Sequence, residues 1–396
     1  MTGSNEHPNP FDKDIDRRQV PALKVHPMVL GADGEGLFAA GVADMDFEAP
    51  PAVLAAMQKR LEHGVFGYEA VPDGLYPALI EWVNRRHGWR IEQGHILRAP
   101  NILNALAIAA SIFTEEGDGV IVQPPVFFDF FDILRENHRR IVSNPLRLQD
   151  GRYGMDFEDL EAKAADPRTK MIYLCNPHNP VGRVWTADEL RTLGDICLNH
   201  GVTVVSDEMH GDLAFPGHAF VPFASLGDDH AANSIISLSP AKTFNIASCC
   251  SAFTVIADET KRDAFQVENS RLTVNKNNAF ANAAMEAAFL DGEPWLQTVL
   301  AYLQGNVDLV RSRLEDLPGV NMTEPEGTFL LWLDLRGLNL APDDLTAFLR
   351  KKAQWAVTRG PAFGDEGIGF ARLNIGCPRA NLDAALNRLT EAVTSL

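Results

Sequence analysis

Short apolar runs rich in β-branched residues alternate with amphipathic stretches along most of this 396-residue chain, and this alternation is the feature that most restricts its fold. It is typical of α/β proteins, in which helices connect the strands of one sheet. The runs hold few charged residues, so we expect a mostly parallel sheet covered by helices on both faces. One helix is expected after Thr186, because Glu189 completes a capping box. The expected strands are GVIVQ (119–123), MIYLCN (171–176), VTVVSDE (202–208), SIISLS (234–239) and AFTVIAD (252–258).

From about residue 291 the pattern of the sequence changes. A long amphipathic stretch (293–317) leads into two strand-like segments, which are followed by a helix, a short strand and a final helix. This order is typical of a smaller α+β domain. The first forty or so residues have no sheet pattern of their own and are expected to pack against that domain. We therefore expect a large α/β domain over residues 46–290 and a small domain formed by residues 1–45 and 291–396.

Charge and cysteine content exclude several classes of function. The formal net charge of −18 argues against nucleic acid as a partner, because phosphate binding needs clustered Lys and Arg. No apolar run is long enough to span a membrane, and the polar N-terminal residues are not typical of a signal peptide. The five cysteines are scattered, and none of them forms a pair with zinc-site spacing. We expect a cytoplasmic protein with reduced thiols and no membrane partner.

Three of the apolar runs end in clusters of polar residues. The clusters are Asn176-Pro-His-Asn-Pro180, Asp207-Glu-Met-His210 and Ser239-Pro-Ala-Lys242. In parallel α/β sheets, ligands bind beyond the carboxyl ends of the strands, so the three clusters are expected to meet at one edge of the sheet. An amide, a carboxylate and an amine that converge there indicate a binding or catalytic site.

Metal and nucleotide sites are the competing interpretations of these polar and glycine-rich segments. Carboxylate and imidazole are metal ligands, but the DEMH cluster (207–210) has two-residue spacing on a strand end, and the chain has no HExxH, so no metal is expected. The glycine clusters GADGEG (31–36) and GDEGIG (364–369) do not lie between a strand and a helix of a βαβ unit. They are expected to form turns and not a nucleotide-binding loop.

Seven motifs in order along the chain resemble one enzyme family. Together they resemble the fold-type I pyridoxal phosphate (PLP) enzymes, within them the class I/II aminotransferases, and among these the MalY/PatB subgroup of cystathionine β-lyase-like C–S lyases. The resemblance implies a mostly parallel, seven-stranded type of sheet in a large domain, with a smaller α+β domain. The motifs are VADMDFEAPP (42–51), HGVFGYE (63–69), NPHNPVG (176–182), SDEMH (206–210), SPAKTFN (239–245), PEGTFLLWLDL (325–335) and FARLNIGCPR (370–379).

The resemblance implies a role for each polar cluster. Lys242 is the amine that carries the cofactor's aldehyde and later moves the substrate proton. Asp207 matches the carboxylate that keeps the pyridine nitrogen protonated. Asn179 matches the donor to the phenolic oxygen, with Asn176 a weaker candidate. His210 stands where many aminotransferases have tyrosine, and histidine there resembles the C–S lyase subgroup.

The cofactor phosphate is expected at the start of the apolar helix that follows residue 100, where free backbone N–H groups bind anions. Ile102 and Leu103 supply these groups. The family usually has glycine where this chain has Asn101, and asparagine is expected to tolerate the left-handed backbone conformation there. The Ser239 hydroxyl and Tyr68 of the opposite subunit are implied to join the phosphate site, so the resemblance implies a homodimer with its active site at the interface.

Phe127 occupies the position at which the family stacks a tyrosine on the cofactor ring, which keeps the aromatic face and loses a hydroxyl. A second departure is Ser248-Cys249, where glycine and an aliphatic residue are usual.

For the substrate, Arg372 matches the guanidinium that binds the amino acid carboxylate. Ala43 and Asp44 are implied to line the substrate side.

The implied reaction is β-elimination from cystathionine or another S-substituted L-cysteine, a small-molecule amino acid, to give pyruvate, ammonia and a thiol. Transamination of an L-amino acid needs the same Lys242, Asp207 and Arg372, so it remains the main alternative. A non-catalytic regulatory partner with this fold is a remote alternative, because Lys242 and Asp207 are both present.

Overall fold

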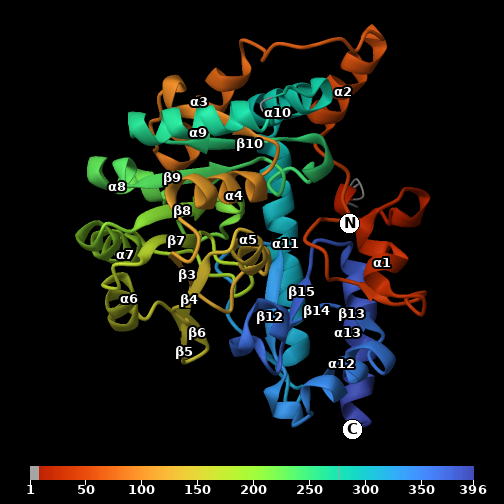
Figure 1. The fold of residues 1–396 in the computed structure, drawn as a ribbon. Helices are drawn as coiled ribbons and strands as arrows, with labels where there is room; N and C mark the ends of the chain where they lie inside the picture. The colour runs from red at the N-terminus through yellow and green to blue at the C-terminus, as the bar shows by residue number, and fades with distance from the viewer. Residues whose placement is uncertain (1–8, 275) are drawn as a thin grey trace.

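The computed structural model describes residues 9–274 and 276–396. Figure 1 shows a broad sheet with its helices, from which the long helix α11 (Glu293–Leu314) runs toward the C-terminal elements. Every helix within these residues is too short or too polar to traverse a lipid bilayer.

The large sheet has seven strands in the order β2-β10-β9-β8-β7-β3-β4. Neighbours from β9 to β4 are parallel, whereas β10 is antiparallel to both β9 and β2. The expected mostly parallel sheet is therefore confirmed, and the last of the five expected strands is the one that reverses direction. The strands are β2 (Ile96–Ala99), β3 (Gly119–Val122), β4 (Arg140–Ser143), β7 (Thr169–Cys175), β8 (Thr203–Asp207), β9 (Ser234–Leu238) and β10 (Ala252–Val255).

Both faces of this sheet are buried. Along β7, Ile172 and Leu174 belong to one hydrophobic cluster, while Met171, Tyr173 and Cys175 belong to a second cluster on the other face. Since successive side chains of a strand point to opposite faces, a strand buried on both faces must be apolar at nearly every position. This explains why the runs in the sequence show so little alternation.

Helices cover the sheet on both sides (Figure 1). Helix α4 packs against β9 and β10 with α5 and α9 beside it, and α6 and α7 pack against β7 and β8. Helix α7 begins after Thr186, where both hydrogen bonds of the expected capping box are present. The helices of this part are α2 (Pro51–His63), α3 (Leu75–His87), α4 (Ile102–Phe113), α5 (Asp129–Glu136), α6 (Phe157–Ala164), α7 (Ala187–His200), α8 (Asp228–Ala232), α9 (Glu259–Arg271) and α10 (Ala279–Asp291).

The C-terminal elements form a second, antiparallel sheet in the order β11-β12-β15-β14. The N-terminal strand β1 (Phe38–Ala39) pairs with β13 in parallel, so this strand joins the C-terminal part of the molecule. The remaining elements are α1 (Pro27–Leu30), β11 (Asn321–Met322), β12 (Leu330–Asp334), α12 (Pro342–Lys351), β13 (Trp355–Ala356), β14 (Thr358–Arg359), β15 (Phe370–Asn374) and α13 (Arg379–Thr394). The strands β5 (Arg147–Gln149) and β6 (Arg152–Gly154) form a separate two-stranded antiparallel sheet.

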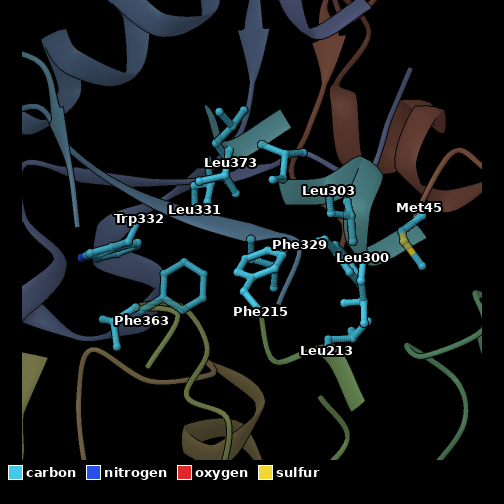
Figure 2. Packing of buried hydrophobic residues seen from close by; sticks show 14 of the residues in the cluster. Met45, Leu213, Phe215, Leu300, Leu303, Phe329, Leu331, Trp332, Phe363 and Leu373 are labelled. Atoms are coloured by element: carbon cyan, nitrogen blue, oxygen red, sulfur yellow. The ribbon is translucent and has the colours of Figure 1, made fainter. Parts of the chain in front are cut away.

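One buried cluster ties these parts together. Figure 2 shows Leu300 and Leu303 of α11 close to Met45 from the N-terminal segment, with Phe329, directly before β12, nearby. The domain boundaries expected at 45/46 and 290/291 stay a prediction, and residues 1–8 lie outside the described residues. The two glycine clusters form turns and short 3-10 helices, as expected.

Candidate active site

The polar clusters at the strand ends meet at one edge of the large sheet. In the strand register, Cys175 pairs with Asp207, and Asp207 pairs with Ser237 of the next strand. Asn176 follows β7 directly, and its backbone N–H donates to the Asp207 carbonyl at 3.0 Å. The expectation that these residues gather at the carboxyl ends of parallel strands is confirmed.

Lys242 lies in a cavity of about 720 Å³ together with Ala43, Phe127 and Arg372. The Lys242 side chain is half-buried, and its Nζ donates a hydrogen bond to the Ala43 carbonyl at 2.6 Å. Burial lowers the pKa of Lys242, and the nearby Arg372 acts in the same direction, while Asp44 and Asp207 oppose it. A lysine in this setting releases its proton more readily than one on the surface, as a nucleophile or base requires.

Arg372 lies in the middle of β15 and is 2% exposed. It donates to Asn179 Oδ1 at 3.0 Å, to the Gly41 carbonyl at 2.7 Å and to Thr358 Oγ1 at 3.3 Å. Burial lowers the pKa of Arg372 to about 9, with Asp129 acting in the opposite direction. This guanidinium has no carboxylate within ion-pair distance among the described residues, although buried charges are normally paired.

Asp207 and His210 are both buried, and the charge of Lys242 acts on each of them. Burial raises the pKa of Asp207 to about 6, against the Met209 backbone hydrogen bond and the charge of Lys242. Burial, then Lys242 and Arg372, lower the pKa of His210 to about 3, so this imidazole is neutral at physiological pH. Uncompensated burial of this kind is frequent at functional sites.

The carboxylates of the DEMH cluster (207–210) do not share hydrogen-bond partners. Asp207 Oδ1 accepts from Met209 N at 3.1 Å, whereas Glu208 Oε1 accepts from Ser206 Oγ at 3.0 Å and from Phe223 N at 2.8 Å. Burial raises the pKa of Glu208 to about 8. The neighbouring side chains along this strand end are therefore held in different hydrogen-bond networks.

Helix α4 begins beside the same sheet edge, with Ile102 buried and Leu103 half-buried. The expectation of a left-handed backbone conformation at Asn101 is wrong. Its φ of −159° and ψ of 174° are extended, and its Oδ1 caps the helix by accepting from Asn104 N at 2.8 Å. Asparagine is suited to this position because of its capping side chain, which satisfies one of the otherwise free N–H groups.

Ser239 lies just beyond β9 and is 8% exposed. Its hydroxyl donates to the Ser251 carbonyl at 3.0 Å and lies 3.5 Å from Cys250 Sγ. Ser248 is exposed, and nothing in its contacts explains why it stands where a smaller residue is usual in the family.

Two of the expected residues lie apart from the cavity of their own chain. Tyr68 is fully exposed on the extended segment between α2 and α3. The Asp44 carboxylate accepts from Arg17 at 2.7 Å and lies 3.6 Å from Lys24 Nζ, so these two cations engage it. Its neighbour Ala43 supplies the cavity wall and the carbonyl that accepts from Lys242.

Several residues that hold segment 42–46 in place were not predicted from the sequence. Lys24 Nζ donates to the Asp44 carbonyl at 3.1 Å and to Asp46 Oδ2 at 2.9 Å, and Arg17 donates to Asp46 Oδ1 at 2.8 Å. From the other side, Asn374 Nδ2 donates to the Asp44 carbonyl at 2.7 Å and to the Val42 carbonyl at 2.6 Å. Two cations and an amide thus fix the segment that contacts Lys242.

Replacing Lys24 by methionine is expected to lower the free energy of unfolding by about 3 kcal/mol, as is typical when one partner of a buried ion pair is removed. Lys24 is 2% exposed, and its loss leaves the carboxylates of Asp44 and Asp46 with less positive charge. Urea unfolding measures the change. Lys13→Met is the control, because the Lys13–Glu48 pair is exposed and its loss is expected to cost less than about 1 kcal/mol. Equal losses in the two variants would contradict this account.

Comparison with known proteins agrees with the geometry. Residues 38–389 match the family of aminotransferase class I and II proteins. The chain is 43% identical to "Cystathionine beta-lyase PatB" of Bacillus subtilis (strain 168), over 89% of this chain and 92% of that protein. It is 32% identical to "Protein MalY" of Escherichia coli (strain K12), over 90% of this chain and 91% of that protein.

A solved structure shows the same fold with a cofactor. Cystalysin from Treponema denticola, whose crystal structure contains pyridoxal 5'-phosphate, superimposes with a TM-score of 0.93 at 31% identity, over 97% of this chain and 98% of that one. The motifs at the strand ends point to the same family as three findings, which are the similar fold, the extent of the family match and the identity to the curated relatives. The chain therefore belongs to the aminotransferase class I and II family.

Proposed function

We propose that the protein is a PLP-dependent C–S β-lyase, which converts an S-substituted L-cysteine to pyruvate, ammonia and a thiol. The observation that carries the proposal is the half-buried Lys242 amine, which shares one cavity with the buried Arg372 guanidinium. The 43% identity to a cystathionine β-lyase supports the lyase reaction, since an aspartate aminotransferase of Pyrococcus horikoshii is 24% identical.

Unsatisfied polar atoms support the fit of the cofactor and the substrate. Arg372 Nε, His210 Nδ1 and Asn176 Oδ1 are buried and have no hydrogen-bond partner among residues 9–274 and 276–396. Buried polar atoms are normally paired, so unpaired atoms around one site call for a polar ligand. The phenolic oxygen of a bound pyridine ring and the carboxylate of an amino acid would supply acceptors for the Arg372 and His210 nitrogens.

Specific residues would hold PLP. Asn179 Oδ1 faces Arg372, which can only donate, so the Asn179 amide N–H groups remain available for the phenolic oxygen. Asp207 would accept the pyridine N–H, and this added cation would favour the carboxylate that burial disfavours. The first amides of α4, at Ile102 and Leu103, have no intrahelical acceptor and suit the phosphate. The Ser239 hydroxyl, which donates to the Ser251 carbonyl in this structure, would turn from that carbonyl to the phosphate. Phe127 would cover the ring.

The remaining chemistry is assigned to two basic side chains, the amine of Lys242 and the guanidinium of Arg372. When bound, PLP supplies an aldehyde and an electron sink for the negative charge left on Cα. Lys242 Nζ takes the Cα proton, and its lowered pKa favours the neutral amine that this step needs. Arg372 binds the substrate carboxylate and so holds Cα within reach of Lys242 in the same cavity. The bond between the β-carbon and sulfur then breaks, and the thiolate that leaves takes up a proton to become the thiol. Water hydrolyses the remaining 2-aminoacrylate to pyruvate and ammonia.

We also propose a homodimer in which Tyr68 completes the partner's phosphate site. Tyr68 is fully exposed, and Val65 and Phe66 beside it are 65% and 52% exposed. Exposed apolar and aromatic residues on one extended segment are typical of a surface that is buried by a partner. The cytoplasmic location expected from the sequence stays a prediction.

In the protein freed of its cofactor, Asp207→Asn is expected to raise the free energy of unfolding near pH 7 by about 3 kcal/mol. Burial raises the folded-state pKa of Asp207 from 3.8 to about 6, so the folded protein binds this proton more tightly than the unfolded chain. The wild type should lose that stability as the pH rises from about 4 to about 6. Urea unfolding across this range measures it, and an identical pH dependence in the Asp207→Asn variant would contradict the assigned pKa.

The choice between elimination and transamination is tested by the need for an amino acceptor. Purified protein with PLP is given L-cystathionine, with and without a 2-oxo acid, and pyruvate, thiol and new amino acid are measured. The proposed function predicts that the rate of pyruvate release is the same in both mixtures. Turnover that requires the 2-oxo acid, with its conversion to the amino acid, would replace the lyase assignment by an aminotransferase assignment.

A further inference from the structure

The cavity around Lys242 and Arg372 extends well beyond the groups that hold the reacting amino acid. Its volume of about 720 Å³ lies in the range of pockets that enclose drug-sized ligands. Its outer wall is formed by the start of α5 and by the segment from β13 to residue 362. This wall carries charged side chains that the proposed elimination does not use.

Asp129, the first residue of α5, is one of these charges. It lines the cavity and is half-buried, and its carboxylate makes no hydrogen bond or ion pair with any residue that the structure describes. Burial raises its pKa, as does Asp132, while Arg372 and Lys242 lower it, so the carboxylate lies within electrostatic reach of both cations of the site. The helix N-terminus explains why an acid is tolerated here. The dipole of the helix stabilises the Asp129 carboxylate, but within the described residues no side chain forms a hydrogen bond or ion pair with it.

Arg359, the last residue of β14, is the complementary charge. It lines the same cavity and is exposed, and within the described residues its guanidinium makes no hydrogen bond or ion pair. Arg350 on the same wall differs, because it is engaged by the Asp33 carboxylate and the Leu30 carbonyl. Arg359 is therefore the cation of this wall that is available to a ligand.

We propose that this outer part of the cavity is a binding subsite for the S-substituent of the substrate, in which Asp129 binds an ammonium group and Arg359 binds a carboxylate. The subsite rests on the proposed β-lyase function and assigns two specificity-determining residues to it. Asp129 and Arg359 would favour S-substituted L-cysteines whose substituent ends in a second amino acid head, as in L-cystathionine, over those that lack either charge. The thiol that leaves is then itself an amino acid.

The two charges contribute unequally. An ammonium group at the half-buried Asp129 forms a charge-assisted hydrogen bond, which corresponds to about a tenfold gain in kcat/KM. A carboxylate at the exposed Arg359 forms a solvent-screened pair, for which a gain of about twofold to threefold is expected. Both gains are expected chiefly in KM, because the contacts form on binding and lie away from the bonds that break.

Matched substrates isolate each contact. S-(3-Carboxypropyl)-L-cysteine differs from L-cystathionine only by lacking the distal ammonium group, and S-(3-aminopropyl)-L-cysteine lacks only the distal carboxylate. The wild type is expected to prefer L-cystathionine to the carboxypropyl compound about tenfold in kcat/KM. Asp129→Asn is expected to abolish this preference while retaining activity on the carboxypropyl compound, which also shows that the variant is folded. Arg359→Gln is expected to abolish the smaller preference over the aminopropyl compound.

Asp132→Asn is the matched control. Asp132 lies on the same helix, pairs with Arg135 at 3.1 Å and does not line this cavity. Its loss removes a like charge that raises the pKa of Asp129, so Asp129 stays ionised and every preference should be retained. An Asp129→Asn enzyme that keeps the wild-type preference for L-cystathionine would overturn the subsite and leave the β-lyase function standing. Failure of the wild type to release pyruvate from any of the three compounds would overturn the proposed function, and the subsite with it.

Discussion

Lys242→Ala is expected to lower the rate of pyruvate release by at least about 10⁴-fold, the upper end of the effect of losing a positioned proton-transfer group. The loss is large because Lys242 has two roles in the proposed reaction, to hold the cofactor and to take the Cα proton. Its burial beside Arg372, which lowers its pKa, suits it to the second role. In the variant the cavity keeps Arg372 and Phe127, so the substrate is still expected to bind.

Two measurements check this expectation. Steady-state kinetics gives the loss of activity, and borohydride reduction followed by mass spectrometry tests whether the cofactor is covalently attached to the peptide that contains Lys242. Lys261→Ala is the control, since this lysine of α9 makes an exposed hydrogen bond to the carbonyl of Ala232, the last residue of α8, and does not line the cavity. A Lys242→Ala enzyme that retains more than about a hundredth of the wild-type activity would show that another group moves the proton.

Arg372→Met is expected to lower kcat/KM by about 10³-fold, which corresponds to about 4 kcal/mol and lies in the range for removal of one partner of a buried charge pair. Methionine fills much of the space of the arginine side chain without its charge. The guanidinium is 2% exposed, and its Nε has no partner among the described residues, so a substrate carboxylate would be its main counter-charge. The loss is expected in KM as well as in kcat, because an unheld substrate also misplaces its Cα proton.

Two comparisons separate carboxylate binding from a structural role of Arg372. Arg372→Lys keeps the charge without the two-pronged geometry and is expected to fall between the wild type and the methionine variant. The methyl ester of the substrate has no carboxylate charge, so its slow reaction should be insensitive to Arg372→Met. An equal loss on the ester and on the free acid would show that the substitution acts by disturbing Asn179 and Gly41, which the guanidinium also contacts.

Much of the site was predictable because its residues follow the sheet. Asp207 ends β8, and Asn176 and Ser239 lie directly beyond the ends of β7 and β9, so the rule for parallel sheets brings them together whatever the details of packing. The start of α7 was predictable for a similar reason, since the capping box at Thr186 is a local interaction. Lys242 belongs to the polar cluster beyond β9 and was found in the same way, whereas its role and the choice of Arg372 came from the resemblance of their motifs.

The residues that hold segment 42–46 could not be predicted in this way. Lys24 and Asp46 are 22 positions apart and join through irregular backbone, where no periodicity links them. Asp129 and Arg359 come to one cavity from elements more than two hundred positions apart, and only the packing of the two sheets brings them together. The Asn101 backbone was mispredicted because a left-handed turn and a capped helix start both favour asparagine, and the residue type does not distinguish them.

The central claim is that this chain catalyses β-elimination at the cavity around Lys242. The most direct test is the amount of pyruvate released per active site from L-cystathionine by purified protein with PLP and no 2-oxo acid. The account predicts many turnovers, with one thiol and one ammonia formed for each pyruvate. Release of no pyruvate, or of at most one per site, would contradict it.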